Sequence, residues 1–491
     1  MSQMYFSEIF NVSKESLEVY GAFNISLVVD LPLFIDPFLL FNSSKSEYQK
    51  LHAEILNYLK FLKDKSSPEI SSGALKAWYV FSEVKQNWFG YSKAGNVGRG
   101  LAGDFARSLN ENLHHVFTNF SEETITKSSH LEKLCLIKEG VGKDSISDFT
   151  TNLIKDYLLS YTEKYAKDNI STRMCKNVLV SRALFNYETE SWETREYNLP
   201  FYNGDYVLLT PKDLLTKENT WINKEDLIKD FEEIPPTISN EELRAEINNY
   251  FIKELSKNST RRGRIVAIQK SLIKYPEIID YYIKIKEENG EDAVNISAKH
   301  VRDSQTLYID NLSHLCDFLK EQTQFYSVVK SDSYTEALER TQYLKDAIEK
   351  NDCYKIFYSS EGEPIKKESD LQLIYRLVWF GSEYSVDGQV NNGRGSSDYL
   401  VSKGSRDKTV IEMKLASNPD LKPNLVKQAE IYAEANNTDK IIKMIVFFTE
   451  KEHMRVLKIL KELNLSKAEN IILIDARNDN KEPASKVKLI D

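Results

Sequence analysis

Apolar residues recur every three or four positions along much of the first 350 residues, the spacing of one face of a helix. In residues 46–64 this face consists of Leu51, Ile55, Leu59 and Leu62. The same spacing predicts further helices within 75–116, around 150–168 and over most of 240–350. The N-terminal part of the chain is therefore predicted to be largely helical.

Two segments of this part carry strand and turn signals instead. Residues 1–45 suggest strands and turns. The stretch YNLPFYNGDYVLLTPKDLL, residues 197–215, is strand-like, with turn signals at Asn203-Gly204 and Pro211. Some strands are therefore expected among the N-terminal helices.

The pattern changes near residue 360, where shorter segments with strand periodicity begin. The predicted order is a helix over 367–380, strands over 384–390, 396–402 and 408–416, and a helix over 422–436. A strand (IIKMIVFFTE), a helix (KEHMRVLKILKELN) and a strand (NIILIDA) follow. Such an order is typical of a mixed sheet flanked by helices.

These patterns predict an α+β chain of several domains, in line with its length of 491 residues. A mixed α/β region for recognition or regulation is expected at 1–240, a helical region at 241–355, and the α/β domain at 356–491.

Composition and charge narrow the class of protein. Hydrophobic residues make up 41% and charged residues 28%, which is a globular composition. The net charge of −9 means that a nucleic-acid partner must meet a local basic patch. The four cysteines form no C-x-x-C pair and no stretch has about 18 consecutive apolar residues, so we expect a cytoplasmic protein without a membrane partner.

Three ionisable residues, Asp398, Glu412 and Lys414, lie in strand-like segments that otherwise read as buried. The two-residue period of a strand places Glu412 and Lys414 on one face. If the turn KGSRD is centred on Ser405, residue i pairs with residue 810 − i, and Asp398 lies opposite Glu412. The sequence therefore predicts two carboxylates and a lysine on one face of a strand pair.

Opposed carboxylates on paired strands destabilise the sheet unless something offsets their repulsion. A shared proton, a lysine between them or a divalent cation each would do so. Mg²⁺ binds through one or two carboxylates and takes further ligands from water and substrate phosphate. The Met413 carbonyl offers one more oxygen, and Lys414 can orient or deprotonate a water molecule.

The ordered set of Asp398 and Glu412-x-Lys414, after the glycine-rich GRGSSD, resembles the signature of the PD-(D/E)xK nuclease superfamily. In the following predicted helix, Gln428 and Tyr432 match the Q-x-x-x-Y extension of RecB-like members. The resemblance implies a restriction-endonuclease-like domain that hydrolyses phosphodiester bonds with Mg²⁺, for which Mn²⁺ can substitute. It implies that Asp398 and Glu412 bind the metal, that Lys414 acts on the attacking water, and that Gln428 and Tyr432 shape the site.

The resemblance covers about residues 360 to 485, and one residue departs from it: Ser397 stands where the signature has proline. A glutamate on the first helix often completes the metal site in this superfamily. Glu368 lies at the corresponding end of the predicted helix, with Asp370 and Gln372 as competitors.

Basic residues that can contact phosphate lie in two places. The stretch SKNSTRRGRIVAIQK holds Arg261, Arg262 and Arg264 at the start of a predicted helix, where the helix N-terminus also favours anions. Arg394 lies in the glycine-rich segment before Asp398. The alternative for the first stretch is a solvated loop.

The function expected from these features is Mg²⁺-dependent endonuclease cleavage of DNA. The remainder of the chain resembles bacterial proteins found with phage-defence and restriction genes, which implies antiviral defence and a companion defence protein. Cutting both strands with one site per chain favours a homodimer. Two alternatives remain open: an RNA-directed nuclease, and a non-catalytic module that binds nucleic acid or protein.

Overall fold

The computed structural model describes residues 3–90, 103–116, 123–137, 142–257, 260–327, 332–380, 385–388, 398–403, 407–426 and 438–481. Contacts divide the chain into two compact units. The N-terminal unit comprises Tyr5–Tyr91 and Asn96–Val301, and the C-terminal unit comprises Arg302–Asp491 with Met1–Met4 and Ser92–Gly95. This division differs from the boundaries expected at 240 and 355, because residues 241–301 pack with the N-terminal elements.

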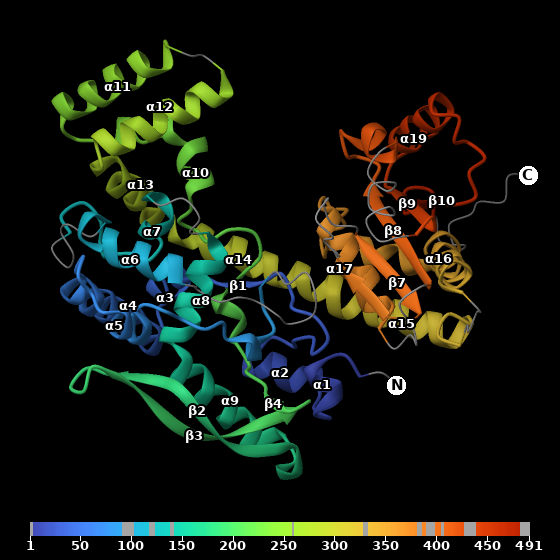
Figure 1. The fold of residues 1–491 in the computed structure, drawn as a ribbon, viewed down its shortest axis with the longest axis horizontal. Coiled ribbons are helices and arrows are strands. Elements are labelled where there is room, and N and C mark those ends of the chain that lie inside the picture. The colour runs from blue at the N-terminus through green and yellow to red at the C-terminus, as the bar shows by residue number, and fades with distance from the viewer. Residues whose placement is uncertain are drawn as a thin grey trace, which may run out of the picture. The chain divides into compact units, whose positions relative to one another are not determined.

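The N-terminal unit is mainly helical (Figure 1). Its α-helices are α1 (Phe6–Ile9), α2 (Lys14–Tyr20), α3 (Pro37–Phe41), α4 (Ser46–Lys65), α5 (Ser72–Trp78), α6 (Gly103–Val116), α7 (Lys133–Ile137), α8 (Lys143–Leu153), α9 (Lys155–Asn169), α10 (Lys224–Lys229), α11 (Glu241–Leu255), α12 (Arg261–Lys274), α13 (Glu277–Glu288) and α14 (Gly290–Gln305). Short 3₁₀ turns are η1 (Lys85–Asn87), η2 (Thr172–Met174), η3 (Lys212–Leu214), η4 (Phe231–Glu233) and η5 (Pro235–Thr237).

Helix α4 confirms the helix predicted from its apolar spacing. Leu51, Ile55, Leu59 and Leu62 are all buried, as expected for the face of a helix that packs on a core. The helices predicted around 150–168 and over 240–350 are also present as α8, α9 and the series from α11 to α16.

The strands of this unit are β1 (Phe34–Ile35), β2 (Cys175–Asn186), β3 (Ser191–Tyr202), β4 (Asp205–Tyr206) and β5 (Leu215–Thr216). β2 and β3 form a long antiparallel hairpin to which β4 adds a third strand, and α9 packs on this sheet (Figure 1). Asn203 and Gly204 have φ angles of 47° and 89°, which confirms the predicted turn. A register shift between Val180 and Leu184 interrupts the alternation of β2.

The expectation of strands and turns over residues 1–45 is wrong where α1, α2 and α3 form; β1 has two residues, and turns and isolated β-bridges occupy much of the remainder. Local capping explains the difference. The Ser13 side chain accepts a hydrogen bond from the Ser16 amide at the start of α2, and Asp36 accepts one from the Phe38 amide at the start of α3. Gly21, with a φ of 82°, ends α2.

The C-terminal unit is a mixed five-stranded sheet with helices on both faces (Figure 1). Its strands are β6 (Ser385–Gly388), β7 (Tyr399–Lys403), β8 (Asp407–Leu415), β9 (Ile441–Phe447) and β10 (Ile471–Asp475), and its helices are α15 (Asn311–Gln322), α16 (Ser333–Lys350), η7 (Asp352–Phe357), α17 (Glu368–Val378) and α19 (Glu450–Glu462). The spatial order is β10-β9-β8-β7-β6, with β6, β7 and β8 antiparallel and β8, β9 and β10 parallel. The predicted mixed sheet is confirmed.

The helices on the two faces bury β8 completely over its last seven residues. On one face, the α16 residue Ser333 hydrogen-bonds Thr409 at 2.8 Å, and the α17 residue Tyr375 packs its ring 5.5 Å from that of Tyr399. On the other face, Ile445 and Phe447 of β9 join a core with three α19 residues, Val456, Ile459 and Leu460. Charged side chains on β8 are therefore enclosed rather than solvated.

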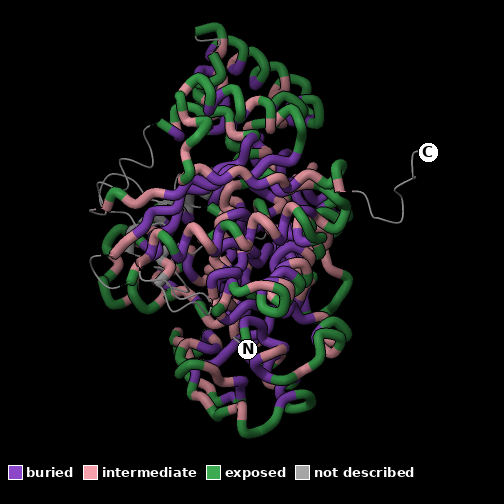
Figure 2. Tube along the Cα trace, turned by 90° about the vertical axis from the view of Figure 1, so that its right-hand side faces the viewer, coloured by how far each residue is buried: buried purple, intermediate pink, exposed green. Residues whose placement is uncertain are grey.

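A π-helical turn, Thr306–Asp310, joins α14 to α15 without breaking the helix. It carries Tyr308, whose hydroxyl donates to the Asp370 carboxylate of α17 at 2.5 Å in the interior. Figure 2 shows exposed residues in green and buried residues in purple, both of which occur in the hairpin of α11 and α12 at the top of that view.

Candidate active site

The register of β7 and β8 brings Asp398 and Glu412 together. The residue pairs of the two strands run from Tyr399 with Ile411 to Lys403 with Asp407, and the two residue numbers of each pair sum to 810 as predicted. Asp398 immediately precedes β7, and Glu412 immediately follows Ile411. The two carboxylates therefore lie at adjacent positions at the end of this ladder.

The Lys414 ammonium group lies among three carboxylates. Its Nζ is 2.7 Å from Glu412 Oε1, 3.4 Å from Asp398 Oδ2 and 3.4 Å from Glu368 Oε2. Asp398, Glu412 and Lys414 are all buried, and Glu368 is partly exposed. The structure thus unites the three residues of the signature with the glutamate expected from the first helix.

This cluster lies at the start of β7, next to the pair of Tyr399 with Ile411. The Met413 amide donates to Asp398 Oδ2 at 2.7 Å, and the Leu415 amide donates to Glu368 Oε1 at 3.3 Å. The Asn418 side chain also donates to Glu368 Oε1, at 2.7 Å. Asp398 and Glu368 therefore accept hydrogen bonds from the β8 backbone.

Helical spacing separates the three candidates on α17. Glu368 and Gln372, four residues apart, share a face, and Gln372 Nε2 donates to Asp398 Oδ1 at 2.5 Å. Asp370 lies on another face and accepts from Tyr308 instead. Glu368 is the member of the cluster, Gln372 orients Asp398, and Asp370 has a structural role. The Tyr399 hydroxyl further fixes this end of α17 by donating to the Gln372 carbonyl.

Burial and mutual repulsion perturb the carboxylates. Burial raises the pKa of Asp398, against the opposing effects of the Lys414 ammonium and the Met413 amide. Burial, followed by the nearby Asp398 carboxylate, raises the pKa of Glu412 to about 7. Burial opposes protonation of Lys414, but the Asp398 and Glu412 carboxylates raise its pKa above the ordinary value. The lysine therefore stays protonated at neutral pH in this arrangement.

The donors of the cluster fit a hard divalent cation. Three carboxylates against one ammonium leave two uncompensated negative charges when all are ionised, and carboxylate oxygens are the ligands that Mg²⁺ prefers. Glu412 Oε2 is buried and has no hydrogen-bond partner among the residues that the structure describes. Among the described residues, no three His, Cys, Asp or Glu side chains already surround one common point as ligands, because these carboxylates converge on Lys414.

The sequence reading missed two residues beside the cluster. Lys443 of β9 pairs in register with Glu412, is buried, and donates from Nζ to the Leu425 carbonyl at 2.7 Å. A lysine within the otherwise apolar strand IIKMIVF could have indicated a buried polar contact at this position. Asn418, the second, follows β8 in the segment ASNPD, where no pattern pointed to Glu368.

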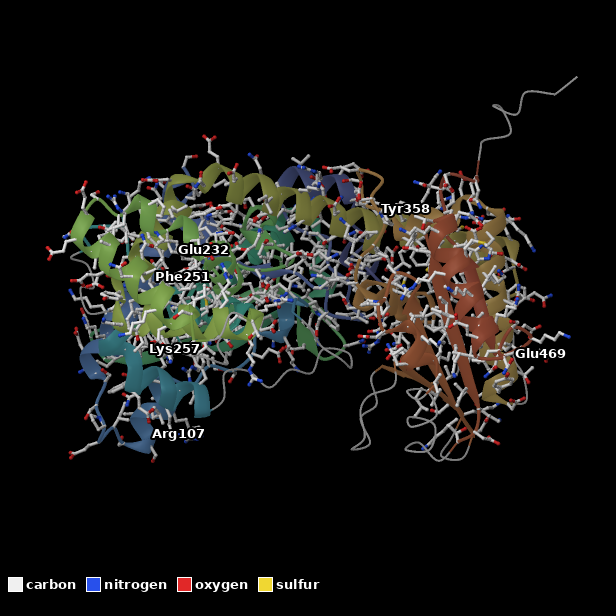
Figure 3. The ribbon with its side chains drawn as sticks, turned by 90° about the horizontal axis from the view of Figure 1, so that it is seen from above. Arg107, Glu232, Phe251, Lys257, Tyr358 and Glu469 are labelled. Carbon is white, nitrogen blue, oxygen red and sulfur yellow. The ribbon has the colours of Figure 1, made fainter. Side chains whose placement is uncertain are left out.

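The remaining predicted residues are not placed at this cluster. The Arg264 side chain forms hydrogen bonds within the N-terminal unit. It donates to Glu232 Oε1 at 3.1 Å and to the Ile228 carbonyl at 3.0 Å; Figure 3 labels Glu232. Arg261 and Arg262 are exposed at the start of α12. Gln428, Tyr432 and Arg394 lie outside the described residues, as does the turn at Ser405; residues 421–426, at the start of their predicted helix, are helical.

Comparison with known proteins gives two partial family matches. Residues 11–223 match a domain of unknown function, DUF8370, and residues 333–450 match a second, DUF8371. The second match includes Glu368, Asp398, Glu412 and Lys414. No curated protein matches the chain, and no solved structure matches it. In the described parts of the chain, the helices lack the length and apolar character needed to cross a bilayer.

Proposed function

We propose that the C-terminal unit is a metal-dependent nuclease that hydrolyses phosphodiester bonds of DNA. The observation that carries the proposal is the convergence of Glu368, Asp398 and Glu412 on Lys414 at the start of β7. Buried carboxylates with excess negative charge need a cation or protons, and a lysine beside a metal site is suited to phosphate chemistry.

Asp398, Glu412 and Glu368 would hold Mg²⁺, or Mn²⁺ in its place. The bound cation would supply Lewis-acid stabilisation of the phosphate charge and lower the pKa of a water. The Met413 carbonyl is a further candidate ligand, because a strand residue directs its carbonyl to the same side as its amide, here toward Asp398.

The residues of the chain would prepare this site in three ways. Gln372 and the Met413 amide hold the two oxygens of Asp398 in fixed directions. Asn418 and the Leu415 amide do the same for Glu368. Lys414, once displaced from the carboxylates by a cation, is positioned to orient the attacking water or to neutralise charge on the phosphate.

The test is cleavage by the full chain of plasmid, single-stranded DNA and transfer RNA, with Mg²⁺ or with EDTA. Lys414→Ala should abolish Mg²⁺-dependent cleavage, a loss of roughly a hundredfold or more for a group that contacts the reacting atoms. Lys408→Ala is the matched control, since Lys408 lies on the same strand about 20 Å away. Undiminished cleavage by Lys414→Ala, or equal cleavage in EDTA, would overturn the proposal.

The same assay separates the alternatives. Cleavage of transfer RNA alone would assign an RNA-directed nuclease with the same site, since the metal chemistry acts on phosphate and not on the sugar. Binding without cleavage in Mg²⁺ and in Mn²⁺ would assign a non-catalytic module. Linear products from plasmid would support action as a homodimer. A cytoplasmic role in antiviral defence, with a companion protein, is part of the proposal and is tested by phage challenge of cells that carry Lys414→Ala.

A further inference from the structure

The N-terminal unit contains a cavity of about 610 Å³, within the range of small-molecule sites. Four segments line it: the end of α2, the start of α4, one face of α9 and the turn before η3. The α9 face presents Tyr157, Tyr161 and Lys164, which helical spacing places on one side of the helix. Tyr20 and Tyr48 complete an aromatic lining.

The tyrosine hydroxyls of this cavity are already hydrogen-bonded within the protein. Tyr20 donates to the Tyr161 carbonyl at 2.7 Å, and Tyr161 donates to the Tyr20 carbonyl at 3.1 Å. Tyr48 donates to Asp213 at 2.8 Å, and Tyr157 donates to Glu47 at 3.4 Å. Three of these tyrosines are half-buried: Tyr20, Tyr157 and Tyr161. Because their hydroxyls already form hydrogen bonds within the protein, they present the surface of their rings to a ligand.

The rings are also held in fixed orientations relative to one another. The ring centroids of Tyr20 and Tyr161 are 4.5 Å apart, and those of Tyr157 and Tyr161 are 5.9 Å apart with an interplanar angle of 31°. Tyr48 meets Tyr157 edge-on at 6.1 Å. A rigid aromatic wall binds a planar ring with little loss of side-chain entropy.

Three lysines and two acids give this cavity its charge. Lys45 pairs with Asp213 at 2.5 Å, and Lys212 pairs with Glu18. Lys164 is exposed and, among the described residues, makes no hydrogen bond or ion pair. An available ammonium group one helical turn beyond Tyr161 suits an anionic group attached to a planar ring.

We propose that this cavity binds a nucleotide unit, with the base against the tyrosine rings and the phosphate against Lys164. Base stacking on aromatic side chains tolerates any base, and lysine contributes the phosphate contact. Two sources share this chemistry: a free nucleotide, and an unpaired nucleotide of a nucleic-acid strand. The site is separate from the carboxylate cluster, so the proposal does not depend on nuclease activity.

Binding is measured on the full chain in EDTA, which prevents metal-dependent cleavage. The probes are ATP, dTTP, adenosine, inorganic triphosphate, a short oligothymidylate and a short DNA duplex, followed by calorimetry. We expect ATP and dTTP to bind with a Kd below about 1 mM and more tightly than adenosine or triphosphate. Tighter binding of the oligothymidylate would identify a strand as the source, and exclusive binding of mononucleotides would identify free nucleotide.

Two pairs of variants test the two contacts. Tyr157→Leu should weaken binding roughly tenfold, and Tyr157→Phe should stay within about twofold, because the ring makes the contact. Lys164→Glu should weaken it roughly tenfold, and Lys167→Glu, an exposed position on α9 outside the cavity, should not.

Lys164→Glu alters an exposed side chain and so tests the site even if Tyr157→Leu does not fold. Absence of binding by every nucleotide probe would overturn the proposal. Triphosphate binding as tight as ATP binding would also overturn it, and so would nucleotide binding unchanged in both Tyr157→Leu and Lys164→Glu.

Discussion

Replacing Glu132 with glutamine should change how the stability of the N-terminal unit depends on pH. Glu132 directly precedes α7, is 1% exposed, and has no hydrogen-bond partner for either carboxylate oxygen among the described residues. Burial, followed by repulsion from the buried Asp36, raises its pKa well above the ordinary 4.5, and the backbone amides of Glu132 and Phe38 oppose this shift only in part. The folded protein therefore holds a proton on Glu132 that the unfolded chain releases.

The proton held by Glu132 determines whether the stability of the folded protein rises or falls with pH, and by how much. Because the folded-state pKa is raised, the contribution of Glu132 to stability is fully present below pH 4.5 and is lost as the pH rises toward the folded-state pKa. The loss is about 1.4 kcal/mol for each pH unit in that window. Glutamine keeps the shape of the side chain and releases no proton.

Urea unfolding of the wild type and Glu132→Gln at pH 5, 6 and 7, followed by circular dichroism, measures the difference. The variant should gain stability relative to the wild type as the pH rises, by at most about 1.4 kcal/mol per pH unit. Glu69→Gln, at an exposed position, is the matched control and should show a difference that does not change with pH. A pH-independent difference for Glu132→Gln as well would show that Glu132 is not a buried neutral acid.

Two further predictions concern the C-terminal unit. Mg²⁺ at ten times its Kd should stabilise the wild type by about 1.4 kcal/mol in thermal unfolding and Glu412→Gln by much less, because the variant removes a charged ligand; equal stabilisation of both would place the cation elsewhere. Tyr308→Phe should lower the free energy of unfolding by about 1–3 kcal/mol, since it takes a hydroxyl donor from the buried Asp370. Tyr343→Phe, on a partly exposed residue of α16, is the control, and a loss below about 0.5 kcal/mol for Tyr308→Phe would contradict this role.

The carboxylate cluster could be predicted from the sequence because its geometry is mostly local. Strand periodicity and a turn of fixed length set the register that places Asp398 beside Glu412. Glu368 was identifiable only by its place on a helix, and its contacts with the Leu415 amide and Asn418 depend on how α17 packs against the sheet. Long-range packing of this kind leaves no periodic signal in the sequence.

The short helices of residues 1–45 could not be predicted from periodicity. Helices of four to seven residues hold too few turns for an apolar repeat, and side-chain caps such as Ser13 and Asp36 decide where they form. The alternation of charged and apolar residues in β8 did not reveal what covers the face that carries Glu412 and Lys414. The core that Phe447 shares with α19 covers that face.

The hydrogen bonds from the β8 backbone to the cluster have a consequence for how this domain could diverge. Asp398 and Glu368 accept hydrogen bonds from the β8 backbone. Each side chain therefore satisfies a backbone amide of the sheet, and this structural role would persist after a loss of catalysis. Glu412 and Lys414 contact the cluster through their side chains, and among the described residues neither side chain forms a hydrogen bond with the β8 backbone. In relatives, retention of Asp398 and Glu368 alone would mark a preserved sheet, and retention of Glu412 with Lys414 would mark a working site. For the same reason, Asp398→Asn is a better inactive variant than Asp398→Ala, since the amide oxygen can still accept from Met413.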